Sequence, residues 1–263
     1  MRTPERFVAV DWSGSAHPAG QRKHIWTSVA GEGAFSGFTR AELSRWIVET
    51  FAGQPAVIGL DFAFSFPVAF FRDRHLSTVG ELWRAAEVHG ETWLRQCEPP
   101  FWGRPGRKCP PGHAGEGFRR TDREIRVAGI SPKSPLQIGG AGAVGTGSIR
   151  GMPVLRQLRS AGFSIWPFDP PSLPLILEIY PRLLTGPVNK SHQSARAAYL
   201  NRSEFQSLSA EDRLAAEGSE DAFDAIVSAL RMRACAAQFP KLRQADDATE
   251  LLEGRIWTPE LAV

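Results

Sequence analysis

The sequence predicts an α/β protein: a mixed five-stranded sheet with helices on both faces, interrupted by a long irregular insertion. Two observations favour this fold class. The first quarter of the chain has the pattern β-β-β-α-β, and three short apolar runs have the length and composition of buried strands. Because 263 residues can enclose one large core, we expect a single domain over residues 1–263, with the insertion at about 98–151.

Turn and capping residues define the first elements. Gly31, Glu32 and Gly33 form a tight turn between two expected strands, and the polar segment before Lys23 is expected to be a turn. Thr39 and Glu42 have the spacing of a capping box and begin a helix that we expect to end near residue 51. The expected strands around them cover residues 7–11, 24–30, 34–38 and 56–62, the first three as an antiparallel meander.

The later elements follow from hydrophobic periodicity. We expect Pro153 in the first turn of its helix, where proline is favoured. A weak edge strand is expected around residues 255–257. The other expected elements are helices over residues 78–96, 152–161, 191–200, 210–218 and 219–238, and strands over residues 163–168 and 175–179.

Composition sets broad limits on function. Hydrophobic residues make up 42% and charged residues 22% of the chain, with a net charge of +3, as in ordinary globular proteins. This charge permits a nucleic-acid partner without requiring one. No apolar run approaches the ~20 residues of a membrane helix, and the N-terminus lacks the apolar core of a signal peptide. We therefore expect a cytoplasmic protein with no membrane partner.

Carboxylates end the apolar runs. Asp11, Asp61 and Glu178 each follow such a run directly. A buried carboxylate costs several kcal/mol unless it is paired, hydrogen-bonded or bound to a metal. Each of these residues alone could bind backbone amides or cap a neighbouring helix, but together they predict a site for a hard cation, which prefers oxygen ligands.

A late helix carries two more acids. Asp221 and Asp224 are three residues apart and therefore share a helix face. Acids in a first helical turn also complement the helix dipole, which would explain Asp221 without a site. Asp224 lies further into the helix, and small residues beside it would allow close approach to the strand that ends at Asp11.

The insertion is basic and aromatic. Phe101, Trp102 and Phe118 are interleaved with its cations, so the segment could grip a phosphate backbone and stack bases. A solvated basic loop is the alternative. The cations expected to bind substrate are Arg104, Arg107, Lys108, Arg119 and Arg120.

A glycine-rich stretch ends the insertion at residues 139–151. It leads into an expected helix start, where free backbone amides can bind phosphate, and we assign Gly147, Ser148 and Arg150 to substrate binding. The stretch matches neither GxxxxGK[ST] nor GxGxxG after a strand, so no nucleotide fold is implied. A flexible lid or a set of tight turns is the alternative.

Zinc is not favoured. Cys97, Cys109 and His113 fit no compact zinc motif.

Taken in order, these motifs resemble those of the ribonuclease H-like superfamily, and residues 221–225 resemble the final helix of its Holliday-junction resolvases. The combination is similar over nearly the whole chain to a bacterial family, domain of unknown function 429, described as predicted nucleases with a ribonuclease H fold. The motifs that carry the resemblance are Val10-Asp11-Trp12-Ser13-Gly14, Gly59-Leu60-Asp61-Phe62-Ala63, Gly145-Thr146-Gly147-Ser148-Ile149-Arg150-Gly151-Met152-Pro153, Glu178-Ile179-Tyr180-Pro181 and Asp221-Ala222-Phe223-Asp224-Ala225.

This resemblance implies a two-metal nuclease, in which Mg²⁺ or Mn²⁺ ions about 4 Å apart activate a water and stabilise the leaving oxygen. It implies that Asp11 bridges the ions, that Asp61 and Glu178 complete the coordination, and that Asp224 or Asp221 holds the second ion. All five acids are then catalytic. The insertion is large for a minimal nuclease. Two alternatives remain: a non-catalytic nucleic-acid-binding module, and an actin-type-fold enzyme acting on nucleotide phosphate, which would need two such half-domains.

Overall fold

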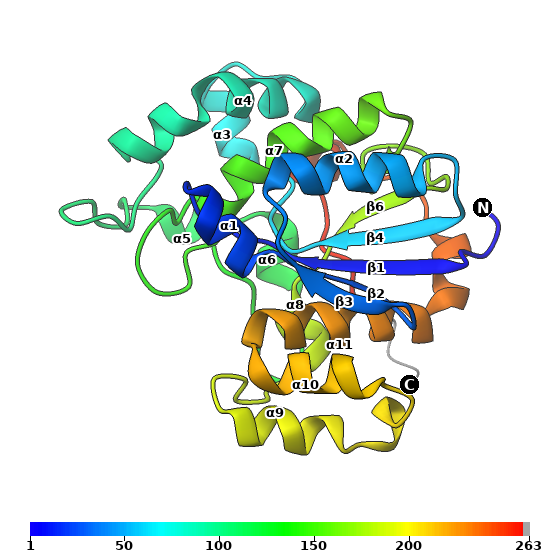
Figure 1. Cartoon of the computed structure of the whole chain (residues 1–263). Helices are drawn as coiled ribbons and strands as arrows, with labels where there is room; N and C mark the ends of the chain where they lie inside the picture. Colours follow the sequence, from blue (N-terminus) through cyan, green and yellow to red (C-terminus); the bar gives the residue numbers. More distant parts are fainter. Residues whose placement is uncertain (260–263) are drawn as a thin grey trace.

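A mixed six-stranded sheet forms the centre of the protein (Figure 1). The computed structural model describes residues 1–259. Within them the strand order is β3-β2-β1-β4-β6-β5, so the prediction of an α/β fold is confirmed, whereas the expected number of five strands was one too few. The strands are β1 (Arg6–Asp11), β2 (Trp26–Val29), β3 (Gly33–Ser36), β4 (Ala56–Leu60), β5 (Ser164–Ile165) and β6 (Leu175–Glu178).

The sheet changes direction at β1. The strands β1, β2 and β3 pair antiparallel, as the expected meander requires. On its other edge β1 pairs parallel with β4, which pairs parallel with β6. Val10 is opposite Leu60, and Leu60 is opposite Glu178. Because parallel strands end at the same edge of a sheet, the residues that follow β1 and β4 lie beside the end of β6.

Helices cover both faces of the sheet, as predicted. In Figure 1, α2, α4 and α7 lie on one side of the strands and α9, α10 and α11 on the other. The helices are α1 (Pro18–His24), α2 (Arg40–Phe51), α3 (Val68–Asp73), α4 (Val79–Gln96), α5 (His113–Glu116), α6 (Arg120–Glu124), α7 (Gly145–Ser160), α8 (Pro181–Thr185), α9 (Gln193–Leu200), α10 (Ala210–Gly218), α11 (Glu220–Ala234) and α12 (Ala248–Glu253), with 3₁₀ turns η1 (Ser203–Phe205) and η2 (Ala236–Lys241). No helix within residues 1–259 is long and apolar enough to span a bilayer.

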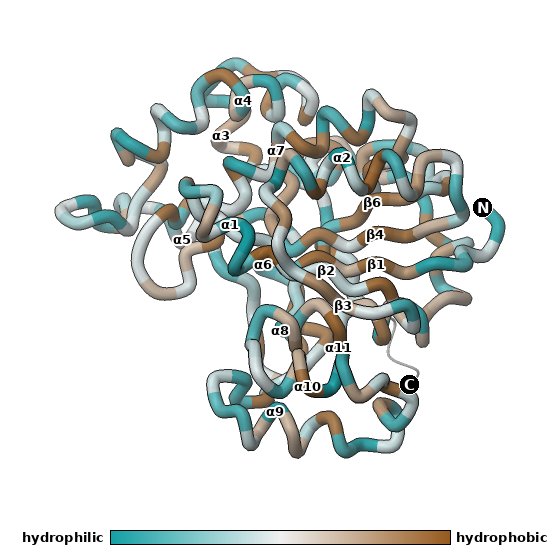
Figure 2. The backbone as a smooth tube through the Cα atoms, in the orientation of Figure 1, coloured by the Kyte–Doolittle hydropathy of each residue, from teal (hydrophilic) through white to brown (hydrophobic). Residues whose placement is uncertain are grey.

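Side chains that point alternately to the two faces of the sheet divide the core into two layers. Val8 and Val10 of β1 join the apolar cluster under α2, α4 and α7, whereas Phe7 and Ala9 join the cluster on the α11 side. Successive strand residues point to opposite faces, so a sheet covered on both sides needs continuous apolar strands. Figure 2 shows this as brown along the central strands and teal on outer helical faces.

Two local predictions were wrong. The segment before Lys23 forms α1, begun by Pro18, so β2 starts only at Trp26. The helix α7 begins at Gly145, which places Pro153 inside it rather than in its first turn. An interior proline costs about 3 kcal/mol. The burial of Met152, Leu155 and Leu158 in α7 offsets this cost.

The end of the glycine-rich stretch is therefore helical. Gly151 lies against Phe62, where a Cβ atom would come within 2.5 Å of the ring, so only glycine lets α7 approach β4 so closely. The helix α11 ends at Ala234, before the expected residue 238, and η2 follows it. The expected edge strand near residue 256 is a single parallel bridge between Ile256 and Glu178; residues 260–263 of that tail lie outside the described residues.

Candidate functional site

Three carboxylates meet at the carboxyl edge of the parallel strands. Asp11 ends β1, Asp61 follows β4, and Asp224 projects from α11. Asp11 is 9% and Asp224 2% exposed, while Asp61 is partly exposed. The helix α11 packs against β1 and β2 through small residues that include Ala225 and Ala229, both buried. These small side chains let the helix bring Asp224 close to Asp11.

The proximity of these carboxylates changes their proton affinity. Burial, followed by repulsion from Asp224, raises the pKa of Asp61 to about 8. Burial, followed by repulsion from Asp224 and then Asp61, raises the pKa of Asp11 well above its usual range. Both carboxyl groups therefore hold a proton more readily than an exposed aspartate does.

Lys190 supplies the positive charge at this site. Its ammonium group forms an ion pair with Asp224 Oδ2, and although burial lowers the pKa of Lys190, the carboxylates, Asp224 foremost, raise it overall. One ammonium does not neutralise three carboxylates. Asp224 Oδ1 is buried without a hydrogen-bond partner among residues 1–259. The cluster therefore has spare acceptor capacity and an excess of negative charge.

Glu178 has a different environment. Arg119 donates to both of its carboxylate oxygens, Nη1 to Oε2 at 2.7 Å and Nη2 to Oε1 at 2.6 Å, and the Phe64 amide donates to Oε2 at 2.9 Å. Asp122 binds the same guanidinium group at 2.9 and 3.0 Å. Burial opposes the charge of Arg119, but Asp122 and Glu178 raise its pKa overall. Arg119, assigned to substrate binding from the sequence, is 1% exposed and serves this ion-pair network.

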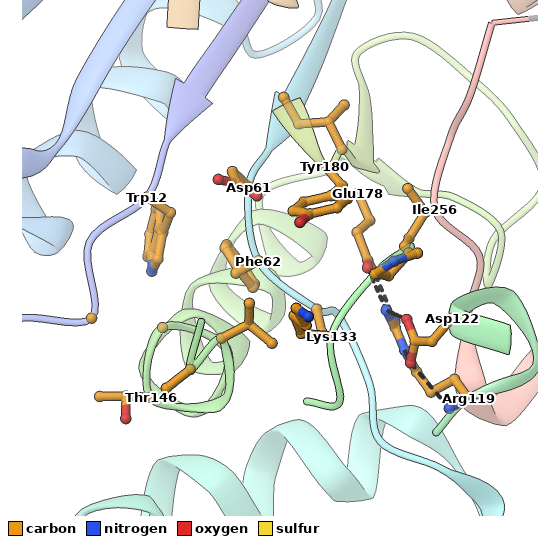
Figure 3. A pocket seen from close by; sticks show the side chains of 17 residues that line it. Trp12, Asp61, Phe62, Arg119, Asp122, Lys133, Thr146, Glu178, Tyr180 and Ile256 are labelled. Atoms are coloured by element: carbon orange, nitrogen blue, oxygen red, sulfur yellow. Dashed lines mark hydrogen bonds and ion pairs between the residues drawn. The ribbon is translucent and has the colours of Figure 1, made fainter. Parts of the chain in front are cut away.

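Two cavities lie beside Asp61. The first, of about 230 Å³, is bounded by the strand ends, the start of α7 and the insertion (Figure 3). Trp12, Phe62, Lys133 and Tyr180 line it. The second, of about 260 Å³, contains Lys190 and Asp224 in its wall. Asp61 and Tyr180 belong to both walls, so a ligand in either cavity would meet the carboxylate cluster.

The remaining sequence-predicted acid lies at the edge of this site. Asp221 is in the first turn of α11 and forms an ion pair with His24 Nδ1 at 2.9 Å. Its side chain is 33% exposed. Its charge also raises the pKa of Asp11, although burial, Asp224 and Asp61 each contribute more. The Asp221 carboxylate is itself already paired with His24.

Two of the three residues assigned from the glycine-rich stretch have structural partners. Ser148 is buried, and its Oγ accepts from the Ala63 amide at 3.0 Å. Arg150 binds Glu91 at 2.7 and 2.8 Å and donates to the Gly14 carbonyl. Gly147 alone lines the first cavity.

The basic residues assigned from the insertion also fall into two groups, those that are exposed and those that have structural partners. Arg104, Arg107 and Lys108 are exposed in the loop that extends away from the body of the protein between α4 and α5 (Figure 1). Arg120 forms an ion pair with Asp247 at 2.5 Å. Of the five assigned cations, the three in this loop are the ones without an ion-pair partner among residues 1–259, so they are free to meet a large polyanion.

Sequence reasoning missed Trp12, Tyr180, Lys190 and Arg40. Arg40 Nη1 donates to the carbonyl groups of Ser13 and Ser15 at 2.9 and 2.8 Å, and burial, followed by the charge of Arg150, lowers the pKa of Arg40 to about 10. Trp12 and Tyr180 adjoin the predicted acids in sequence, which was a usable signal. Lys190 lies in a loop without periodicity, so no pattern pointed to it.

The zinc-type residues do not come together. Cys97 is buried and Cys109 exposed, while His113 Nε2 accepts from Trp102 Nε1 at 3.1 Å and lies 3.1 Å from Ser134 Oγ. More generally, no three His, Cys, Asp or Glu side chains of residues 1–259 are placed to hold a metal ion in the observed conformation. In the carboxylate cluster, the Lys190 ammonium takes up one oxygen of Asp224.

Comparisons with models of protein families, with curated proteins and with solved structures gave no match. The fold and site define an α/β protein with a buried carboxylate cluster at the carboxyl edge of its sheet. Its function is therefore argued from the chemistry of that cluster.

Proposed function

We propose that this protein is a divalent-metal-dependent nuclease of the ribonuclease H-like type. The sheet supports the fold assignment, because an antiparallel meander of three strands runs through a helix into a parallel fourth strand. The single observation that carries the functional proposal is the convergence of Asp11, Asp61 and Asp224, with one ammonium group paired to Asp224.

These three side chains fit Mg²⁺ or Mn²⁺ chemically. They offer oxygen atoms, which hard cations prefer, and Asp224 Oδ1 lacks a partner in the described structure. A cation here would relieve the repulsion that raises the pKa of Asp11 and Asp61. Glu178 is omitted from this ligand set because Arg119 occupies both of its oxygens.

Bound metal would supply activation of a water molecule and stabilisation of the leaving oxygen of a phosphodiester. The chain itself has three tasks: Asp11 and Asp61 must be ionised, Asp224 must release Lys190, and Lys190 must turn away from the cluster. Its side chain is 28% exposed and lines the second cavity, so it has space to turn toward a substrate phosphate.

The exposed loop with Arg104, Arg107 and Lys108 supports a polyanionic substrate. Its cations would bind the phosphate backbone without reading sequence. We propose nucleic acid as the partner on the basis of this loop and of the carboxylate cluster.

The first experiment is Mn²⁺ titration by calorimetry of the wild type, Asp11→Asn and Asp221→Asn. We expect saturable binding by the wild type and Asp221→Asn, and its loss in Asp11→Asn. Single- and double-stranded DNA and RNA are then tested for cleavage with Mn²⁺. Binding that is unchanged in Asp11→Asn, or metal-independent cleavage, would contradict the proposal.

The main alternative to a nuclease is a non-catalytic nucleic-acid-binding module. Such a module would bind nucleic acid through the exposed loop, show no metal effect, and be indifferent to Asp11→Asn. The actin-type alternative is less favoured, because residues 1–259 form one sheet rather than two half-domains.

A further inference from the structure

The indole of Trp12 is buried with an unused donor. The side chain is 8% exposed, and Nε1 is buried without a hydrogen-bond partner in the described part of the chain. An indole nitrogen can only donate, and buried donors are normally satisfied. Trp12 lines the first cavity, so an acceptor placed there would satisfy it.

Trp12 faces the start of α7. A Cβ atom added to Gly147 would lie 3.6 Å from Trp12 Cδ1, the atom bonded to Nε1. Figure 3 shows the indole nitrogen on the edge of the ring that is turned toward this end of the helix. The amides of Thr146 and Gly147, in the first turn, donate to no acceptor recorded among residues 1–259. First-turn amides and the helix dipole together favour an anion.

Gly14 keeps this helix end open. A Cβ atom at Gly14 would lie 2.9 Å from the Gly147 nitrogen and 3.1 Å from Thr146 Cγ2, so any side chain there would cover the amide. The backbone around Gly14 is fixed, because Arg40 binds the carbonyl groups of Ser13 and Ser15, and Arg150 that of Gly14. The open space between Gly14 and the Gly147 amide is thus a fixed feature of the loop after β1.

We infer that Trp12 Nε1 and the amides of Thr146 and Gly147 form a binding site for one phosphate group of a nucleotide. Lys133 lines the same cavity and adds positive charge. Phe62 and Tyr180 supply aromatic surface against which a base can pack. At about 230 Å³, the cavity has the volume of roughly eight waters at about 30 Å³ each, which suits a phosphate group and part of the attached nucleoside and excludes a duplex.

This inference deepens the proposed function. Asp61 lines the same cavity, so a phosphate at α7 lies within one nucleotide unit of the carboxylate cluster. The chain would therefore act on a strand end or on an unpaired nucleotide whose neighbouring phosphate is held at α7. The other carboxylates of the cavity wall, Asp122 and Glu178, share the charge of Arg119, which reduces their repulsion of that phosphate without cancelling it.

The test compares adenosine 5′-monophosphate with adenosine by calorimetry, with and without Mg²⁺. We expect the monophosphate to bind the wild type at least about tenfold more tightly than adenosine does. Trp12→Phe keeps the ring but removes the donor, and should weaken monophosphate binding about five- to tenfold, as expected for one lost hydrogen bond. Gly14→Ala should remove the preference for the phosphate, whereas Gly218→Ala, where an added Cβ meets nothing within 4 Å, should not.

Amide and indole NMR gives a second readout, in which binding is followed on the wild type. Trp12→Phe assigns the Trp12 indole signal among eight tryptophans. In the wild type, monophosphate should shift that signal and the amides of Thr146 and Gly147. Equal affinity for adenosine and its monophosphate, or an unmoved indole signal, would overturn the inference. Metal binding without phosphate preference leaves the proposed nuclease standing, and phosphate preference without metal binding leaves this site standing.

Discussion

Arg119 of the insertion and Glu178 at the end of β6 form a buried ion pair with two hydrogen bonds, at 2.7 and 2.6 Å. This ion pair holds the insertion against the edge of the sheet where the carboxylates lie. The insertion thus contributes a wall of the first cavity through a fixed connection, although it has little regular secondary structure. The same pair removes Glu178 from the proposed metal ligands.

Breaking this pair should destabilise the protein. Arg119→Met leaves Glu178 and Asp122 buried without their common partner, and such losses cost about 3–5 kcal/mol. We expect the free energy of unfolding to fall by about that amount in urea titrations monitored by circular dichroism. Arg120→Met, which breaks the exposed pair with Asp247, is the control and should cost less than about 1 kcal/mol. Equal effects of the two changes would contradict the buried pair's role.

Stability without metal should fall as pH rises. An acid whose pKa is raised on folding binds more protons in the native state, so stability is lost between its unfolded and folded pKa values. For Asp61 this window runs from about 4 to about 8, and we expect a loss on the order of a few kcal/mol. Thermal unfolding from pH 4 to 8 measures it. Asp61→Asn should flatten the dependence of stability on pH, and so should saturating Mg²⁺ if it binds the ionised carboxylates.

Asp224 and Asp221 should differ in metal binding. Asp224 is buried and its Oδ1 has no hydrogen-bond partner among residues 1–259, whereas Asp221 is paired with His24. Asp224→Asn should weaken Mn²⁺ binding by at least about 100-fold, and Asp221→Asn by about threefold or less, in calorimetric titrations. Comparable losses would place Asp221 among the ligands.

Lys190 should compete with metal. Its ammonium group is paired with Asp224, so Lys190→Met should tighten Mn²⁺ binding about tenfold, equivalent to about 1.4 kcal/mol. It should also slow any nucleic-acid cleavage if Lys190 contacts substrate after turning away. Lys108→Met, in the exposed loop, serves as the control for Mn²⁺ affinity. Weaker metal binding by Lys190→Met would show that the ammonium supports the metal site instead.

The exposed loop should set the salt dependence of nucleic-acid binding. Removing Arg104, Arg107 and Lys108 by changes to Gln should reduce the slope of log K against log salt by about 2–3 for duplex DNA, at about 0.9 per phosphate contact. Fluorescence anisotropy across a salt series measures it. The control is Arg2→Gln with Lys241→Gln, which removes charges near the start of β1 and leaves the loop unchanged. Arg2 precedes this strand, and Phe239, two residues before Lys241, packs on Phe7 of β1. An unchanged slope in the triple variant would remove the loop from the interface.

The sequence by itself determined the α/β class, the meander, the helices on both faces, the positions of Asp11 and Asp61 at strand ends, and that of Asp224 on the late helix. These features depend on local periodicity, caps and turns, which neighbouring residues specify. The helix α1 was expected to be a turn, and the start of α7 was missed because tertiary packing stabilises an interior Pro153 that local preference disfavours.

Only the tertiary structure decided which charges meet. Nothing local distinguishes Glu178, which follows an apolar run as Asp61 does, yet Arg119 from 59 residues away binds it. Likewise Lys190 reaches Asp224 across 34 residues, and Trp12 meets Gly147 through the packing of α7. Charge pairing acts through space over a few ångströms and is indifferent to sequence separation, so it became visible only once the chain was folded.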